Sequence, residues 1–204
     1  MQNKSLRFSL IIAIVFVSLN ELALFCNELI PRLLSRFMEI DFYQWMSLGS
    51  HVSSVLIGGF YLSLMVAGIS LIAGNKSGVM AWIGGGLMAF HGLLSFVRIV
   101  LYYIFRVMER FEAIDLLYHQ GVTWCFVLLY AAALIMVAVH YKSGALIGIA
   151  SAKAVVGILV QTAAIFLEQG RYTTYSIITG TGSLIGFVLS LLFFIFWLRQ
   201  VPKQ

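Results

Sequence analysis

The chain has 204 residues, of which 61% are hydrophobic and only 10% are charged. This composition lies well outside the averages for a soluble globular domain and indicates an integral membrane protein. The formal net charge of +5 is spread over the ends of apolar stretches. It does not form the clustered basic stripe that nucleic-acid binding requires, so we expect no nucleic acid as a partner.

Six apolar stretches are each long enough to cross a bilayer as a helix. A hydrocarbon core of about 30 Å requires roughly 20 helical residues. The stretches cover residues 6–27, 48–73, 79–105, 121–141, 145–167 and 176–198. The sequence therefore predicts an all-α fold: a polytopic bundle of six transmembrane helices, with residues 1–204 forming a single integral membrane domain. The lipid bilayer is its expected surrounding partner.

The first span carries an acidic residue inside the hydrocarbon region. The pair Asn20-Glu21 recurs seven residues later as Asn27-Glu28, so the two glutamates share one stripe of a helix. Glu28 should reach the outer interface, and Glu21 should lie about 10 Å deeper. Because an unpaired charge is costly there, Glu21 is either a proton or cation site or a structural partner of a buried base.

Two connections between spans are amphipathic. Residues 31–39 and residues 106–119 each place apolar side chains at helical spacing, opposite arginines and acids. Pro31 suits the first position of a helix, where its missing N–H is harmless. We expect two short amphipathic helices that lie in the outer membrane interface.

The second and third spans each carry a polar face. His51 belongs to such a face in the second span, with serines and Tyr61 at helical spacing. In the third span, His91, Arg98 and Tyr102 follow a single face. His91 should lie near the depth of Glu21, so we expect Glu21 to pair with Arg98 or with His91. The alternative is that Arg98 extends to the outer interface and His91 bonds to a neighbouring hydroxyl or backbone group.

The fifth span places Lys153, Gln161 and Glu168 on one stripe. Lys153 has no acid at its predicted depth, so we expect it to extend to the cytoplasmic interface. The outer halves of these polar faces predict a cavity that opens to the outside. Its candidate ligand or ion-pair residues are Glu21, His51, His91, Arg98, Tyr102, Gln161 and Glu168.

The orientation follows from the charged residues. Threading the six spans alternately places all eight acids at or near one side and almost all lysines at the other. Lys4 and Arg7 flank the first span at its N-terminal side. By the positive-inside rule, we expect a multi-pass protein of the cell (inner) membrane with both termini in the cytoplasm.

The tripeptide Lys-Ser-Gly occurs at residues 76–78 and again at 142–144, each time between an inward and an outward span. One interpretation is a parallel duplication that relates residues 31–104 to residues 105–168. The alternative is that Gly and Ser recur because they are ordinary turn residues.

Several familiar site types are absent from the sequence. It contains no His-x-x-x-His or Cys-x-x-Cys pattern, so we expect no metal site and no cofactor. The sequence also offers no catalytic residue set. Cys26 and Cys125 are isolated, and we interpret them as small buried hydrophobic residues rather than a disulfide.

Three functions compete. The preferred one is a non-catalytic subunit or partner-binding component, which would contact other membrane proteins through glycine-rich helix faces. The alternative is a small transporter or ligand-binding membrane protein that uses the outward-facing cavity. An enzyme acting on lipid head groups, with His91 or Glu21 as general base, ranks last because it lacks a nucleophile or metal.

Overall fold

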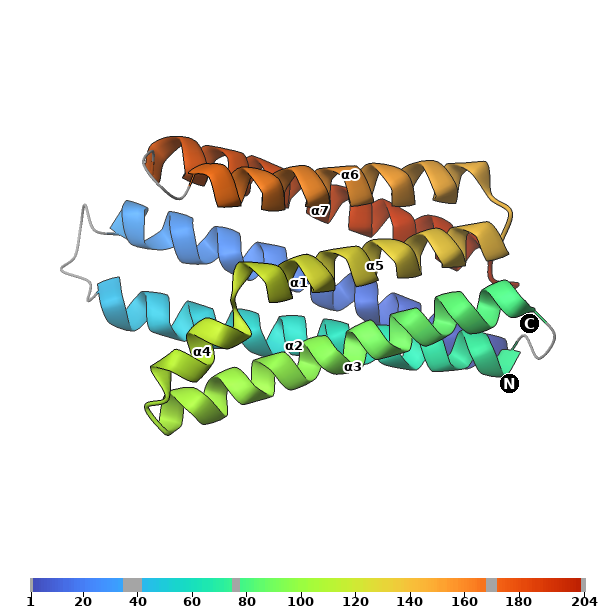
Figure 1. The fold of residues 1–204 in the computed structure, drawn as a ribbon, viewed down its shortest axis with the longest axis horizontal. Helices are drawn as coiled ribbons and strands as arrows, with labels where there is room; N and C mark the ends of the chain where they lie inside the picture. The colour runs from blue at the N-terminus through green and yellow to red at the C-terminus, as the bar shows by residue number, and fades with distance from the viewer. Residues whose placement is uncertain (1, 35–41, 75–77, 168–171, 203–204) are drawn as a thin grey trace.

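The computed structural model describes residues 2–34, 42–74, 78–167 and 172–202 (Figure 1). Within these ranges the chain is almost entirely helical and contains no strand, which confirms the predicted all-α fold. The helices are α1 (Gln2–Leu34), α2 (Phe42–Gly74), α3 (Val79–Val107), α4 (Phe111–Leu117), α5 (Gln120–His140), α6 (Gly144–Leu167) and α7 (Tyr172–Gln200).

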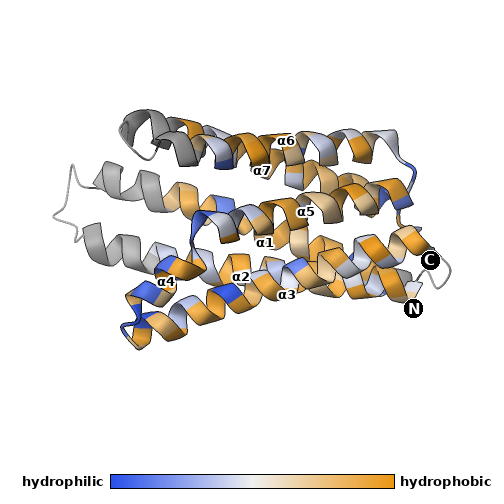
Figure 2. Ribbon diagram, viewed as in Figure 1, coloured by the Kyte–Doolittle hydropathy of each residue, from blue (hydrophilic) through white to orange (hydrophobic). Residues whose placement is uncertain are grey.

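All of these helices except the short α4 are long and apolar enough to cross a membrane, which confirms the six predicted spans. Figure 2 shows these helices as mainly hydrophobic, with hydrophilic segments around α4 and at the turn between α5 and α6. Large apolar side chains such as Phe8, Val55 and Leu159 are exposed on their outer faces. In a bilayer these side chains would contact hydrocarbon, whereas in solution they would contact water.

The spanning helices form a closed ring. Each packs on two principal neighbours in the order α1, α2, α3, α5, α6, α7, and α7 returns to contact α1. Both chain termini lie at one end of this ring, together with the turn between α5 and α6 (Figure 1). We call this the terminal end, and we call the opposite end, where α4 connects α3 to α5, the distal end.

Glycines allow α2 and α3 to approach until their backbones touch. A Cβ added to Gly92 would lie 2.5 Å from the carbonyl oxygen of Tyr61 and 2.8 Å from the backbone nitrogen of Met65. A Cβ on Gly85 would lie 2.7 Å from the carbonyl oxygen of Gly68. Small residues at such positions are the usual means of close helix packing in membranes.

The hydrophobic core fills the terminal half of the ring. It draws on that half of every spanning helix, and its largest fully buried side chains are Trp197, Phe193, Phe194, Leu10, Leu64, Leu71, Met88 and Leu134. At the same end, Arg7 Nη1 donates to the carbonyl oxygen of Val201 at 2.6 Å, which ties α1 to the end of α7. The terminal half is therefore closed by packed side chains.

The two amphipathic segments differ from the sequence prediction in their boundaries. Pro31 does not begin a separate helix, because α1 continues through it to Leu34. Residues 35–39 lie outside the described residues. In the second segment, Arg106 still belongs to α3, and the separate short helix is α4, whose apolar residues Phe111 and Leu116 are exposed.

The delayed start of α4 has a local cause. Glu109 adopts a positive φ of 54°. The N–H of Arg110 bonds to the carbonyl oxygen of Phe105 at 2.8 Å, and that of Glu109 bonds to the carbonyl oxygen of Arg106 at 3.2 Å. This pair of bonds is a Schellman motif, which ends α3 after Val107. The sequence concealed it because the left-handed position is occupied by Glu rather than Gly.

Candidate functional site: a polar chamber inside the helix ring

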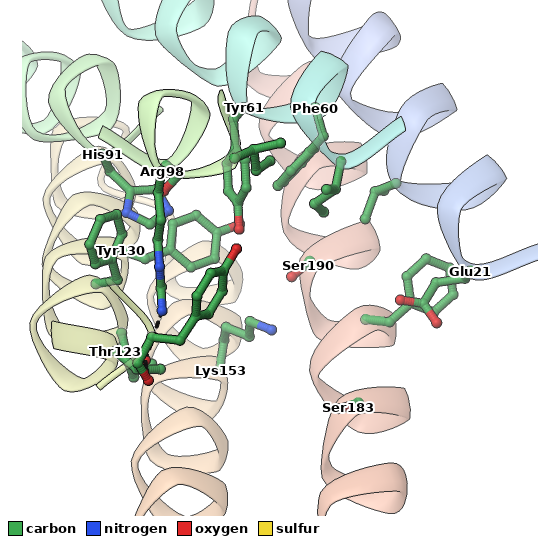
Figure 3. A pocket seen from close by; sticks show the side chains of 18 residues that line it. Glu21, Phe60, Tyr61, His91, Arg98, Thr123, Tyr130, Lys153, Ser183 and Ser190 are labelled. Atoms are coloured by element: carbon green, nitrogen blue, oxygen red, sulfur yellow. Dashed lines mark hydrogen bonds between the residues drawn. The ribbon is translucent and has the colours of Figure 1, made fainter. Parts of the chain in front are cut away.

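A cavity of about 470 Å³ lies inside the ring, distal to the packed core (Figure 3). All six spanning helices and the C-cap residue of α4 contribute to its wall. The lining residues are Val17, Glu21, Ile57, Phe60, Tyr61, His91, Ser95, Arg98, Ile99, Tyr118, Thr123, Phe126, Val127, Tyr130, Lys153, Ser183, Phe187 and Ser190. We call this cavity the chamber. Its volume falls within the range of about 300–1,000 Å³ that is typical of small-molecule sites.

The hydrophobic core forms the wall of the chamber on its terminal side, which we call the floor. Phe60 lines the chamber and also packs edge-on against the core residue Phe194, with ring centroids 5.7 Å apart. Both side chains are buried. The chamber is therefore closed toward the terminal end, whereas Tyr118, near the distal end, remains 45% exposed.

Arg98 extends from α3 toward the start of α5. Its Nη2 donates to Thr123 Oγ1 at 3.0 Å, and the Thr123 hydroxyl donates onward to the carbonyl oxygen of Tyr118 at 3.5 Å. The guanidinium carbon lies 4.2 Å from the ring centroid of Tyr118 and 4.9 Å from that of Phe126. The Nε atom is buried without a hydrogen-bond partner. Two aromatic faces and one hydroxyl thus hold this cation.

His91 lies seven residues before Arg98 on the same face of α3, closer to the terminal end, and aromatic rings surround it. It is only 4% exposed, and its ring stacks on Tyr130 with centroids 4.8 Å apart. Tyr61 and Phe126 approach it edge-on, at 5.7 Å and 6.1 Å. The Nδ1 atom of His91 is buried and has no hydrogen-bond partner. Buried polar atoms are normally satisfied, so this atom has the capacity to bond to a group inside the chamber, water included.

Lys153 turns into the chamber, and the expectation that it extends to the cytoplasmic interface is wrong. Its Nζ donates to the carbonyl oxygen of Gly186 at 2.7 Å, and the Ser190 hydroxyl donates to the same oxygen at 2.9 Å. A Cβ on Gly186 would lie 2.8 Å from Nζ. The missing side chain of this α7 glycine leaves room for the ammonium group beside the carbonyl.

Glu21 lines the chamber from α1, across from Lys153 (Figure 3). Glu21 and Lys153 carry opposite charges on the same chamber wall and attract each other at longer range than a direct hydrogen bond. The expected pairing of Glu21 with Arg98 is wrong, because the contacts of Arg98 are Thr123, Tyr118 and Phe126. The physical reason is that the guanidinium of Arg98 extends to the start of α5, where Thr123 and Tyr118 hold it.

The pairing of Glu21 with His91 is likewise not formed, since the ring partners of His91 come from α2 and α5. Glu21, His91 and Arg98 nevertheless share the chamber wall. The sequence therefore identified residues of one cavity while assigning two of its contacts to the wrong partners.

The other candidate residues lie outside the chamber. Tyr102 lines an adjoining, more open groove of about 380 Å³ between α2, α3 and α4, which shares Ile99 and Tyr118 with the chamber. His51 is exposed, and its Nδ1 lies 3.1 Å from the hydroxyl of Tyr103. Gln161 is half-buried on α6 and does not line the chamber. Glu168 lies outside the described residues.

Several chamber residues were missed from the sequence. Thr123 and Tyr130 lie seven residues apart on α5, and Ser183 and Ser190 lie seven residues apart on α7. Each pair therefore occupies one helix face. This spacing was the available signal, but isolated hydroxyls in an apolar helix are weak evidence until the neighbouring helices are known.

The next question is whether the potential metal ligands and the two cysteines lie close to one another. Within the described residues, no three His, Cys, Asp or Glu side chains gather in one place. Cys26 and Cys125 are both free thiols. Cys125 is exposed, so the expectation that it is a buried hydrophobic residue is wrong.

Comparisons with protein-family models, with curated proteins and with solved structures find no match to this chain. The chemistry of the chamber must therefore be inferred from its own residues.

Proposed function

We propose that this protein is a membrane-embedded ligand-binding protein of the small-transporter type, and that its ligand occupies the chamber. The observation that carries the proposal is the convergence of polar side chains from all six spanning helices on one cavity. Polar groups at membrane depth are costly and are retained where they serve a site. A cavity with apolar walls and a few convergent polar groups is the usual form of a small-molecule site.

This proposal replaces the partner-binding role that the sequence favoured. That role depended on glycine-rich faces free to contact other membrane proteins. Gly85 packs on α2, Gly182 would place a Cβ against Val160 of α6, and Gly186 accepts Lys153. These three glycines are used inside the chain, whereas Gly86, Gly148 and Gly180 have no neighbour within 4 Å and are among those that a partner helix could contact.

We also propose that the ligand reaches the chamber from the distal end and that this end faces the outside of the cell. The packed core closes the terminal side, whereas Tyr118 stands partly exposed on the distal side. Lys4, Lys142 and Arg199 lie toward the terminal end, and the acids around α4 lie at the distal end. The positive-inside rule then places the terminal end, with both termini, on the cytoplasmic side of the cell membrane.

A pair of serine variants tests the use of the chamber. Ser183→Trp adds an indole to the chamber wall, and Ser151→Trp adds the same group at an exposed position of α6 outside the chamber. We expect the neutral probe 2-naphthol to raise the melting temperature of the wild type and of Ser151→Trp in detergent. A ligand at about 100 times its Kd stabilises by roughly 2.7 kcal/mol.

Ser183→Trp should show little or none of this shift, because its indole occupies the space the probe needs. Equal shifts in all three proteins would mean that 2-naphthol acts through the micelle or another surface. That outcome would contradict the proposed function.

A further inference from the structure

The chamber carries one positive charge that no acid on its wall compensates. Its charged lining residues are Glu21, Arg98 and Lys153. The single carboxylate of Glu21 can offset only one of the two cations. Arg98 is left with a neutral hydroxyl and two aromatic faces. Formally, the two cations and one acid leave a surplus of one positive charge.

We propose that the chamber is selective for a small amphipathic monoanion, with its anionic group on Arg98 beside Thr123 and its apolar body against Tyr61, Phe126 and Tyr130. This inference rests on the proposed function and names the ligand class of the same site. A carboxylate is the simplest group of the required charge and shape.

The geometry of Arg98 suits such an anion. A guanidinium has five N–H donors in a planar fork, and carboxylates bind it through two parallel hydrogen bonds. Thr123 Oγ1 accepts a hydrogen bond from Nη2 of Arg98, while Nε of Arg98 is buried and has no hydrogen-bond partner. Cation–π contacts stabilise the charge only in part, so an anion would complete the compensation that the protein leaves open.

The walls on either side of Arg98 suit an apolar body. Tyr61, Phe126 and Tyr130 surround His91, and Phe60 and Phe187 extend the apolar lining. His91 is seven residues before Arg98 on α3, so the two side chains lie on one face, with His91 nearer the floor. The unpartnered Nδ1 of His91, with the hydroxyls of Ser95 and Tyr130, supplies polar contacts at that depth.

Two sources could supply this ligand chemistry. A water-soluble aromatic acid would arrive from the distal solution, and a fatty acid would arrive from the bilayer. Both combine one carboxylate with an apolar body. The test therefore includes a probe of each kind, 2-naphthoate and laurate.

The experiment measures dissociation constants by calorimetry on the full chain in phosphatidylcholine nanodiscs. The aromatic probes are 2-naphthoate, its neutral isostere 2-naphthamide, and the cation 2-naphthylmethylammonium. We expect the wild type to bind 2-naphthoate at least about tenfold more tightly than the amide, and the cation least tightly. Of the two carboxylates, the tighter one identifies the source.

Variants then locate the preference. Arg98→Gln should bring the carboxylate-to-amide ratio close to one, and Arg98→Lys should retain part of it because the charge remains while the fork is lost. Arg106→Gln is the matched control, since Arg106 is exposed and bonds to Tyr102 outside the chamber. This control should keep the wild-type ratio.

Equal binding of carboxylate and amide by the wild type, stronger binding of the cation, or no carboxylate binding would each overturn the inference. The wild-type ratios decide this even if Arg98→Gln does not fold. A carboxylate preference that survives in Arg98→Gln would overturn the role of Arg98. None of these results alters the dependence of 2-naphthol on Ser183, so the two proposals can fail separately.

Discussion

Replacing Gly92 by Ala should destabilise the protein, because α2 and α3 touch at this residue through their backbones. The added Cβ would lie 2.5 Å from the carbonyl oxygen of Tyr61, whereas ordinary contact begins at 3.4 Å. The two helices would have to separate locally by the difference, 0.9 Å. A carbonyl oxygen within a helix cannot rotate away as a flexible side chain can, so the strain must be taken up by the helix pair.

The magnitude follows from packing. Inserting a methyl group into a filled interface typically costs about 1–3 kcal/mol. A radial gap of about 0.5–1 Å also removes roughly a quarter to a half of the dispersion energy of each contact along the seam. The neighbouring close approach of Gly85 to Gly68 shares this seam and would open with it. We therefore expect a loss of about 2–3 kcal/mol in the free energy of unfolding.

Gly86→Ala is the matched control. It lies on the same helix, and a Cβ there would have no neighbour within 4 Å. Its only expected effect is the higher helix propensity of Ala, up to about 1 kcal/mol in favour of the folded state. Reversible unfolding in mixed micelles, titrated with a denaturing detergent, would measure both variants.

Equal stability of Gly92→Ala and Gly86→Ala would refute the packing argument. It would mean that the backbone contact between α2 and α3 does not limit their approach. Because Tyr61 lines the chamber, a separation at Gly92 should also weaken 2-naphthol binding. Gly86→Ala should leave this binding unchanged.

Two further predictions concern charge. Glu21→Gln and Lys153→Met should each lower thermal stability, and the double variant should recover part of the loss. Coupling free energies between interacting residues are about 0.5–3 kcal/mol, and we expect a value toward the lower end because Glu21 is only half-buried. Glu21→Gln combined with Arg98→Gln should instead be additive within about 0.5 kcal/mol; the reverse ranking of these two couplings would contradict the assignment of Lys153 as the partner. For the orientation, a membrane-impermeant maleimide applied to intact cells should label Glu112→Cys, in a background without the native cysteines. Ser143→Cys should react only after permeabilisation, and the opposite pattern would invert the topology.

The sequence alone determined the architecture, and the physical reason is the bilayer. A helix is the only structure that satisfies the backbone of an apolar stretch in hydrocarbon on its own. Length and hydropathy therefore sufficed to place six spans, and the structure confirms them. Boundaries were less accurate where a local motif decided them, as at Glu109, whose left-handed conformation ends α3 without a glycine.

The residues that line the chamber could be predicted only in part from the sequence. Glu21, His91 and Arg98 could be singled out because charged and polar groups are conspicuous within apolar helices. Helical spacing showed which residues of one helix share a face. It could not show which helices face one another, since the lengths of the connections do not fix the order around the ring.

The tertiary structure alone decided the contacts. The guanidinium of Arg98 extends to Thr123 and Tyr118 rather than to Glu21, and the lysine of α6 reaches inward to a carbonyl of α7. The ammonium group bonds to the carbonyl oxygen of Gly186, a residue of another helix whose missing side chain leaves room for it. The direction in which Lys153 extends is thus set by the shape of its neighbour, which periodicity within a single helix does not encode.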